Sequence, residues 1–249
     1  MKTRRFLMNV FLIVLALLYC RASIGQEAFP KSMIKASVQA SLTDRVKVSG
    51  SEGGAAVGST PCLGAVAEAS YWHGLPYGFG INAGIGMALV PSGIRVYNAE
   101  SEAVDKQLFL TPLFSMPISV EKIFSTVCTR QGWTLVGELG AKADCPLYAA
   151  TYGLGSGREQ AEIVSPDGYM VQLDVAKEVF VSCFAKVGLM KLLPNRNVLR
   201  FDVIYNYSIK NFVNGNYIYG IGTAQKTGLL EQRMNYVGLG VTYGIRISK

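Results

Sequence analysis

Few residues in this chain have the types and spacing needed for catalysis. The chain has one histidine, His73, in the segment His73-Gly74-Leu75-Pro76, which is typical of a tight turn. Serine or histidine chemistry needs a base beside a nucleophile, and a turn histidine alone indicates no such pair. The carboxylates Glu68 and Glu138 could perform acid or base chemistry, but we expect them to pair with basic residues. We predict no catalytic residue and no cofactor.

The cysteines do not indicate a metal site. Beyond the first 25 residues, no CxxC pair and no histidine cluster accompanies Cys62, Cys128, Cys145 and Cys183. Export would allow disulfides. A bridge between Cys62 and Cys145 and a set of free thiols are therefore both open.

The first 25 residues read as a signal peptide. Lys2, Arg4 and Arg5 form a charged start, residues 6–19 are mostly apolar, and Ser23-Ile24-Gly25 offers a cleavage site before Gln26. An apolar stretch this short falls below the roughly 20 residues that a membrane-spanning helix needs. Lipid attachment at Cys20 would require a small residue in place of Tyr19. We predict a signal peptide over 1–25, cleaved between Gly25 and Gln26, and an outer-membrane domain over 26–249.

Removing this segment changes the charge of the protein. The whole chain has 24 basic and 17 acidic residues, a net charge of +7, but the mature chain keeps 20 basic residues and a net charge of +3. The remaining charges alternate with apolar residues and do not cluster, which argues against nucleic acid as a partner. Mean hydropathy is +0.26, and no later apolar run reaches 18 residues, so contact with a bilayer would have to be made by strands.

Alternation of apolar and polar residues is the main signal. From Ile34 to Thr43, apolar residues at even positions alternate with polar residues at odd positions, as in a strand with one apolar face. Pro112 and Pro117 weaken the fourth such segment, because proline removes a ladder donor. The predicted strands are 34–43, 63–71, 77–89, 106–124, 133–142, a sixth lying between Tyr169 and Leu192 whose start is open, 199–209 and 236–247.

The connections between these segments differ in length. Long or intermediate connections alternate with short turns, and the longest predicted loops cover residues 144–168 and 211–234. Outer-membrane barrels place short periplasmic turns opposite longer outer loops. The fold class we predict is all-β: an eight-stranded antiparallel transmembrane β-barrel with up-and-down meander topology and both termini in the periplasm.

The polar face decides between a membrane barrel and a soluble one. In the third and eighth segments this face is largely glycine, which weakens the surface of a soluble sheet but makes room inside a narrow barrel. Aromatic residues near the predicted short turns suit a girdle at the membrane interface; they are Tyr71, Trp72, Tyr77, Phe124 and Trp133. A soluble periplasmic, lipocalin-like binding barrel remains the alternative.

Charged residues on the predicted inner face would fill the lumen. Eight strands leave an interior just wide enough for side chains, and buried charges must be paired. We expect Lys186 and Asp202 to lie nearly opposite each other. The predicted lumen polar network consists of Lys35, Glu68, Glu138, Lys142, Lys186, Arg200, Asp202 and Arg246.

Three segments resemble a known family. Leu108–Glu121, with its Leu-Thr-Pro-Leu-Phe run, Pro194–Phe212 and Asn235–Ile247 are similar to the PorT-type outer-membrane β-barrel family of Bacteroidota, over most of residues 33–248. The final Ile247-Ser248-Lys249 departs from the aromatic ending common in such families. The resemblance implies a location in the cell outer membrane and an accessory role in secretion or surface assembly.

The predicted location and loops indicate the partners that we expect for the protein. We predict contact with outer-membrane lipid, and with other envelope proteins through loops 144–168 and 211–234. The alternative of an outer-membrane lipid-modifying or proteolytic enzyme would need a catalytic pair at the outer rim.

Overall fold

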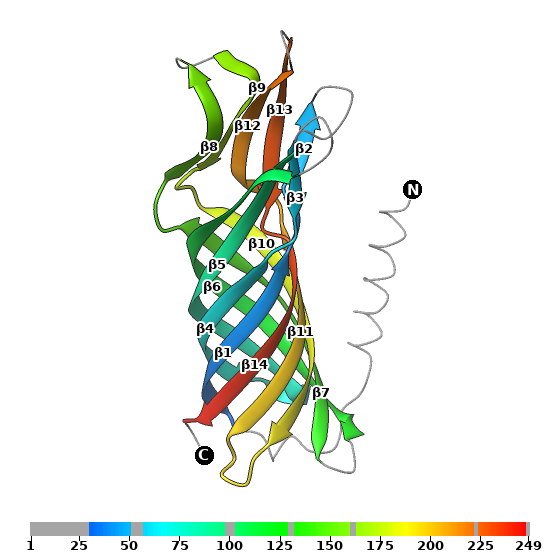
Figure 1. Cartoon of the computed structure of the whole chain (residues 1–249). Coiled ribbons are helices and arrows are strands. Elements are labelled where there is room, and N and C mark those ends of the chain that lie inside the picture. Colours follow the sequence, from blue (N-terminus) through cyan, green and yellow to red (C-terminus); the bar gives the residue numbers. More distant parts are fainter. Residues whose placement is uncertain are drawn as a thin grey trace, which may run out of the picture.

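The computed structural model describes residues 30–50, 57–97, 103–128, 132–159, 163–221 and 224–247. The predicted signal peptide and its Gly25–Gln26 cleavage site lie outside these ranges. Within them, no helix has both the length and the apolar character required to cross a membrane. The chain forms two β-sheets, one closed into a barrel and one standing above it (Figure 1).

Eight antiparallel strands form the barrel. Each strand pairs with the next barrel strand along the chain, and β1 pairs with β14 to close the ring, which confirms the predicted up-and-down topology. The barrel strands are β1 (Ser32–Thr43), β4 (Leu63–Gly74), β5 (Phe79–Tyr97), β6 (Ala103–Cys128), β7 (Trp133–Pro146), β10 (Phe180–Leu192), β11 (Val198–Ser208) and β14 (Tyr236–Arg246).

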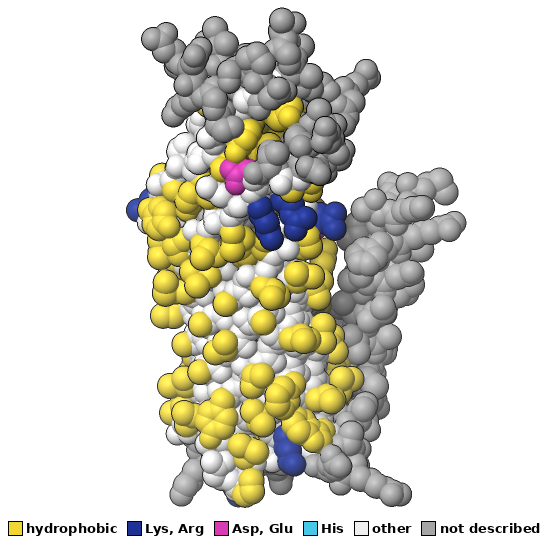
Figure 2. All heavy atoms as spheres, viewed as in Figure 1, with side chains coloured by type: hydrophobic (Ala, Val, Ile, Leu, Met, Phe, Trp, Pro, Cys, Tyr) yellow, Lys and Arg dark blue, Asp and Glu magenta, His cyan; other side chains and the backbone are white. Residues whose placement is uncertain are grey.

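The barrel is apolar outside and polar inside. On β1, Ile34 and Val38 are 53% and 66% exposed, whereas Lys35 and Gln39 are buried. The other barrel strands repeat this arrangement, and Figure 2 shows the resulting hydrophobic side chains on one face of the barrel. Because a soluble barrel buries its apolar face, this inverted pattern is the one expected of a barrel in lipid.

The two prolines are accommodated within β6. Pro112 takes its place opposite Leu89, and its carbonyl accepts a hydrogen bond of 3.1 Å from the Leu147 amide. Beside Pro117 the β5–β6 ladder is interrupted, with pairs at Ala83 and Gly86 but none between them. The register is the same on both sides of the gap, so the missing donor costs ladder contacts without shifting the strand.

A second, five-stranded sheet stands above the barrel, in strand order β2-β13-β12-β9-β8. Its strands are β2 (Lys47–Gly50), β8 (Ala150–Glu159), β9 (Ile163–Val175), β12 (Asn211–Ile221) and β13 (Ala224–Arg233), while β3 (Val57–Thr60) pairs with β5. The prediction of plain loops over 144–168 and 211–234 is therefore wrong. The hairpins β8–β9 and β12–β13 pair through β9 and β12, a contact between distant segments that local alternation does not reveal. The sixth barrel strand begins at Phe180.

The connections at the two ends differ as expected for an outer-membrane barrel. At the lower end in Figure 1, β4 and β5 are joined through a single 3-10 turn, η2 (Pro76–Gly78), and β10 and β11 by a tight turn. At the upper end, the connections from β1, β7 and β11 supply the strands of the second sheet.

The inner face of β5 changes character along its length. Asn82, Gly84 and Gly86 face the lumen, whereas Ile94 and Val96 belong to an apolar core with residues of β9, β12 and β13. The second sheet and the upper part of the barrel thus share one hydrophobic core. Below this core, the middle of the barrel interior is polar.

Candidate functional site

Seven of the eight predicted lumen residues come from five strands and converge inside the barrel. Lys35 lies on β1, Glu68 on β4, Glu138 and Lys142 on β7, Lys186 on β10, and Arg200 and Asp202 on β11. The side chains of these residues are almost completely buried, and the most exposed of them, that of Lys186, is 11% exposed. Arg246 differs, because it is only half-buried at the lower end of β14, where its amide donates to Asn197 Oδ1 at 3.4 Å.

Arg200 occupies the centre of the charged cluster. Its Nη1 donates to Glu121 Oε2 and, at 2.9 Å, contacts Glu138 Oε2, while its Nε donates to Asp202 Oδ1 at 2.5 Å. Lys35 Nζ donates to the same Glu121 oxygen at 2.7 Å. One guanidinium therefore joins carboxylates from β6, β7 and β11.

Lys186 forms the second centre. Its Nζ lies 3.1 Å from Glu68 Oε2 and 3.8 Å from Glu138 Oε1. Directly opposite Lys186 on β11 is Ile204, and Asp202 lies opposite Gly188. Lys186 and Asp202 are thus diagonal neighbours on one face, and each forms ion pairs with other residues of the cluster.

A third group lies higher in the lumen, around Asp144. Ser115 Oγ donates to one carboxylate oxygen of Asp144, and Ser182 Oγ donates to the other at 2.7 Å. Lys142 Nζ is 3.8 Å from Asp144 Oδ1 and donates to the Tyr236 hydroxyl at 3.2 Å. We call all these charged residues together the charged layer; they are Lys35, Glu68, Glu121, Glu138, Lys142, Asp144, Lys186, Arg200 and Asp202.

Two members of the charged layer were missing from the predicted set. Glu121 stands on the polar face of the segment 106–124, where its position already indicated the lumen. Asp144 was assigned to a loop, although β7 continues to Pro146 and keeps even-numbered residues inside. Extending the alternation by two residues would have included it.

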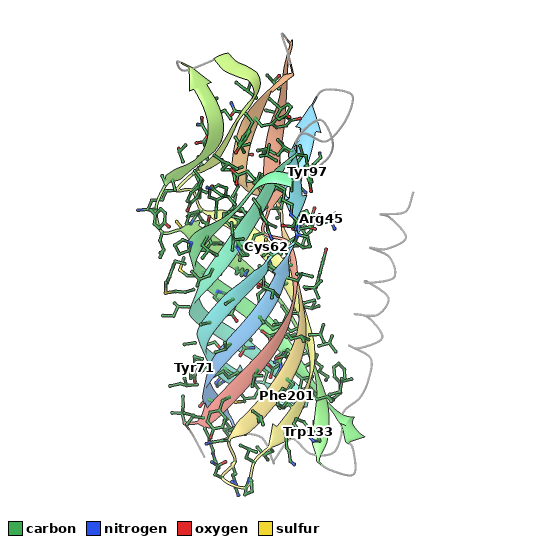
Figure 3. The ribbon with its side chains drawn as sticks, viewed as in Figure 1. Arg45, Cys62, Tyr71, Tyr97, Trp133 and Phe201 are labelled. Carbon is green, nitrogen blue, oxygen red and sulfur yellow. The ribbon has the colours of Figure 1, made fainter. Side chains whose placement is uncertain are left out.

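An apolar cluster lies directly below the charged layer. It is formed by lumen residues at the lower strand ends: Met33, Trp72, Ile123, Val136, Met190 and Val198. Trp72 is 2% exposed and belongs to this lumen cluster, so the prediction that it forms part of an interfacial girdle is wrong. Tyr71 and Trp133 lie in the lower part of the barrel (Figure 3), and the ring of Trp133 packs against that of Phe201, with 5.8 Å between the ring centroids.

The other reactive residues lie apart from the charged layer. The ring of His73 stacks on Tyr71 near the lower end, with 6.5 Å between the ring centroids. Cys62, Cys145 and Cys183 are free thiols, which excludes the Cys62–Cys145 bridge from this structure. The side chain of Cys128 is not among those described. Across the described ranges, no group of three or more His, Cys, Asp or Glu side chains could hold a metal ion.

The closed ring, the apolar outer surface and the charged interior define the class of the protein: it has an outer-membrane β-barrel fold. No family model and no curated protein matches the chain. The likeness to PorT-type barrels thus stays a prediction.

Solved structures with a similar fold include outer-membrane proteins. OprG from Pseudomonas aeruginosa is 12% identical, covering 88% of this chain and 97% of its own, with a TM-score of 0.45. A major outer membrane protein from Thermus thermophilus is 8% identical, covering 86% and 99%, with a TM-score of 0.43. AlkL, determined in lipid bilayers, is 12% identical, covering 93% and 97%, with a TM-score of 0.40. This likeness concerns the fold alone.

Proposed function

We propose that the protein is an integral barrel of the cell outer membrane, closed to diffusion, with a structural or interaction role carried out at its outer end. The observation that carries this proposal is the filling of the lumen. The charged layer lies between the apolar cluster at the lower end and the apolar core shared with the second sheet. Because apolar clusters border the paired charges on both sides, we infer that the lumen offers solutes no continuous polar path.

The outer surface supports lipid as the surroundings of the barrel. Exposed aliphatic residues occur on every barrel strand, among them Val38, Leu239 and Ile118 at 58–68% exposure. Exposed apolar surface on this scale marks contact with membrane or protein. It disfavours the soluble lipocalin-like alternative, in which these residues would face water.

The second sheet is the element that we assign to partner contacts. Its strand β8 lies at one edge and β2 at the other, and unpaired edges can accept a strand from another chain. Envelope proteins of a secretion or surface-assembly system are the partners we propose, as the PorT-type resemblance implies. A lipid-modifying or proteolytic activity is not part of the proposal, because His73 lies at the end opposite the outer rim.

Three kinds of measurement test the proposal. Membrane fractionation and gels of boiled and unboiled protein should show a membrane protein whose mobility depends on heating. In planar bilayers the purified protein should give no conductance above background, and crosslinking in cells should capture a stable envelope partner. A soluble protein without heat-dependent mobility would refute the membrane barrel, and steady single-channel currents would refute the closed lumen.

A further inference from the structure

A polar hollow lies where the barrel meets the second sheet. Its volume is about 300 Å³, and its lining includes three cationic residues, Arg45, Lys47 and Arg233, together with Asn211. Arg45 follows β1, Lys47 begins β2, and Arg233 ends β13. Three chain segments thus bring positive charge to one place on the outer surface, and Figure 3 shows Arg45 at this junction.

The hollow lies directly above the lipid-facing surface. Leu42, 50% exposed, precedes Asp44 of the hollow by two residues on the same face, and Val237, 53% exposed, follows Asn235 by two. On the face seen in Figure 2, dark blue Lys and Arg side chains gather at the upper edge of the hydrophobic band. In the proposed membrane orientation, we expect lipid headgroups to lie at this edge.

Neutral partners hold Arg233 in place. Its Nε donates to Asn211 Oδ1 at 3.2 Å, and its Nη1 donates to the hydroxyl of Tyr207 at 3.3 Å. Tyr207 itself faces outward and is 42% exposed. A guanidinium has five N–H donors, so this anchoring leaves donors and the full positive charge for an anion.

The two acidic residues of the hollow, Asp44 and Glu231, offset only part of its positive charge, which leaves its lining with a net charge of +1 from three cations and two acids. Asp44 Oδ2 accepts a hydrogen bond of 3.3 Å from Asn235 Nδ2, and Glu231 lies opposite Lys47 in the β2–β13 ladder. Among the described residues, no carboxylate oxygen lies within 4.0 Å of a charged nitrogen of Arg45, Lys47 or Arg233. The ion pairs found among these described residues all lie in the lumen.

We propose that this hollow binds the phosphate of an outer-leaflet lipid headgroup, while the acyl chains of that lipid lie along the apolar surface below Tyr207. Planar guanidinium donors suit phosphate oxygens, and the apolar wall beneath the hollow suits the attached chains. The site rests on the proposed orientation of the barrel in the outer membrane.

Native mass spectrometry of the full chain in detergent micelles tests the site, with bis-phosphorylated lipid A as the probe. The variant Arg45→Gln/Lys47→Gln/Arg233→Gln should bind lipid A on the order of 100-fold more weakly, because each cation near an anionic surface contributes roughly fivefold. The matched control Lys31→Gln/Lys191→Gln/Arg196→Gln removes the same charge at the lower end and should bind like the unmodified protein.

Three outcomes would overturn the site. They are equal binding by the hollow variant and its control, equal binding of dephosphorylated lipid A with the same acyl chains, and complete displacement of lipid A by excess inorganic phosphate. The last would indicate a site for free anions. The mobility shift of unboiled protein reports the barrel separately, so a variant that keeps its shift but loses lipid A supports the site, whereas an unmodified protein without a shift counts against the proposed function.

Discussion

Arg200 forms more of the described ion pairs than any other residue of the charged layer. It contacts Glu121, Glu138 and Asp202, and no second cation touches Asp202 within the described ion pairs. Removing one partner of a buried ion pair is far more costly than replacing the whole pair, because it leaves a charge without compensation.

Arg200→Met keeps much of the side-chain volume and removes the charge. We expect it to lower the free energy of unfolding by about 3–5 kcal/mol, because three buried carboxylates lose their shared cation. Urea titration of the mobility shift of unboiled protein would measure this loss. Arg200→Lys, which keeps the charge, should lose clearly less; equal losses would show that shape, and not charge, matters here.

Gly80 makes room for the indole of Trp72 at the base of the lumen. A Cβ at Gly80 would overlap Trp72 Nε1, whereas a Cβ at Gly153 on β8 would meet nothing within 4 Å. The pair therefore separates steric crowding from the general effect of replacing glycine.

We expect Gly80→Ala to cost about 1–3 kcal/mol, the usual range for overpacking, and Gly153→Ala to change stability little. The same urea titration would compare them. Equal unfolding of the two variants would contradict the close approach of the Trp72 indole to Gly80.

Strand β11 offers a test of whether the outer surface of the barrel faces lipid. Val203 and Ile209 are 55% and 56% exposed, but Val203 lies mid-strand and Ile209 just beyond the upper end of β11. Because Val203 and Ile209 are equally exposed but lie at different depths, a comparison of the two positions distinguishes lipid from water as the surroundings of β11.

Val203→Arg should destabilise the barrel by about 2–4 kcal/mol, and Ile209→Arg by about 0–1 kcal/mol, because the cost of a charge in lipid depends on depth. Refolding yields into vesicles, followed by urea titration, would measure both. A protein that tolerated arginine equally at both sites would not have β11 in a bilayer.

The same elements show how far alternation predicts structure. All eight barrel strands and the direction of the Lys35 and Arg200 side chains follow from the pattern, because the alternation of faces along a strand is local information. Strands β9 and β12 do not, since each gains its partner from a segment distant in the sequence. Trp72 was misplaced for a related reason: its even position pointed inward, but its residue type suggested an interface.

For the whole molecule, the first property to establish is which end of the barrel faces the outside of the cell. Leu229 is 59% exposed on the second sheet, and Lys31 is exposed at the opposite end. In a chain whose native cysteines are replaced by serine, a membrane-impermeant maleimide applied to intact cells should label Leu229→Cys and not Lys31→Cys. The reverse pattern would place the second sheet in the periplasm and remove the basis of the lipid-phosphate site.

The ion pairs of the charged layer join parts of the chain that are synthesised far apart. Lys35 and Glu121 are 86 residues apart, Arg200 and Glu121 are 79, and Lys186 and Glu68 are 118. Each of these pairs requires the strands that lie between its two members to be paired and curved into the barrel first, so the charges stay unpaired until that part of the sheet has formed. Opening the finished barrel at the β1–β14 seam would expose several of these charges to lipid at once, and we expect this cost to slow unfolding from the membrane.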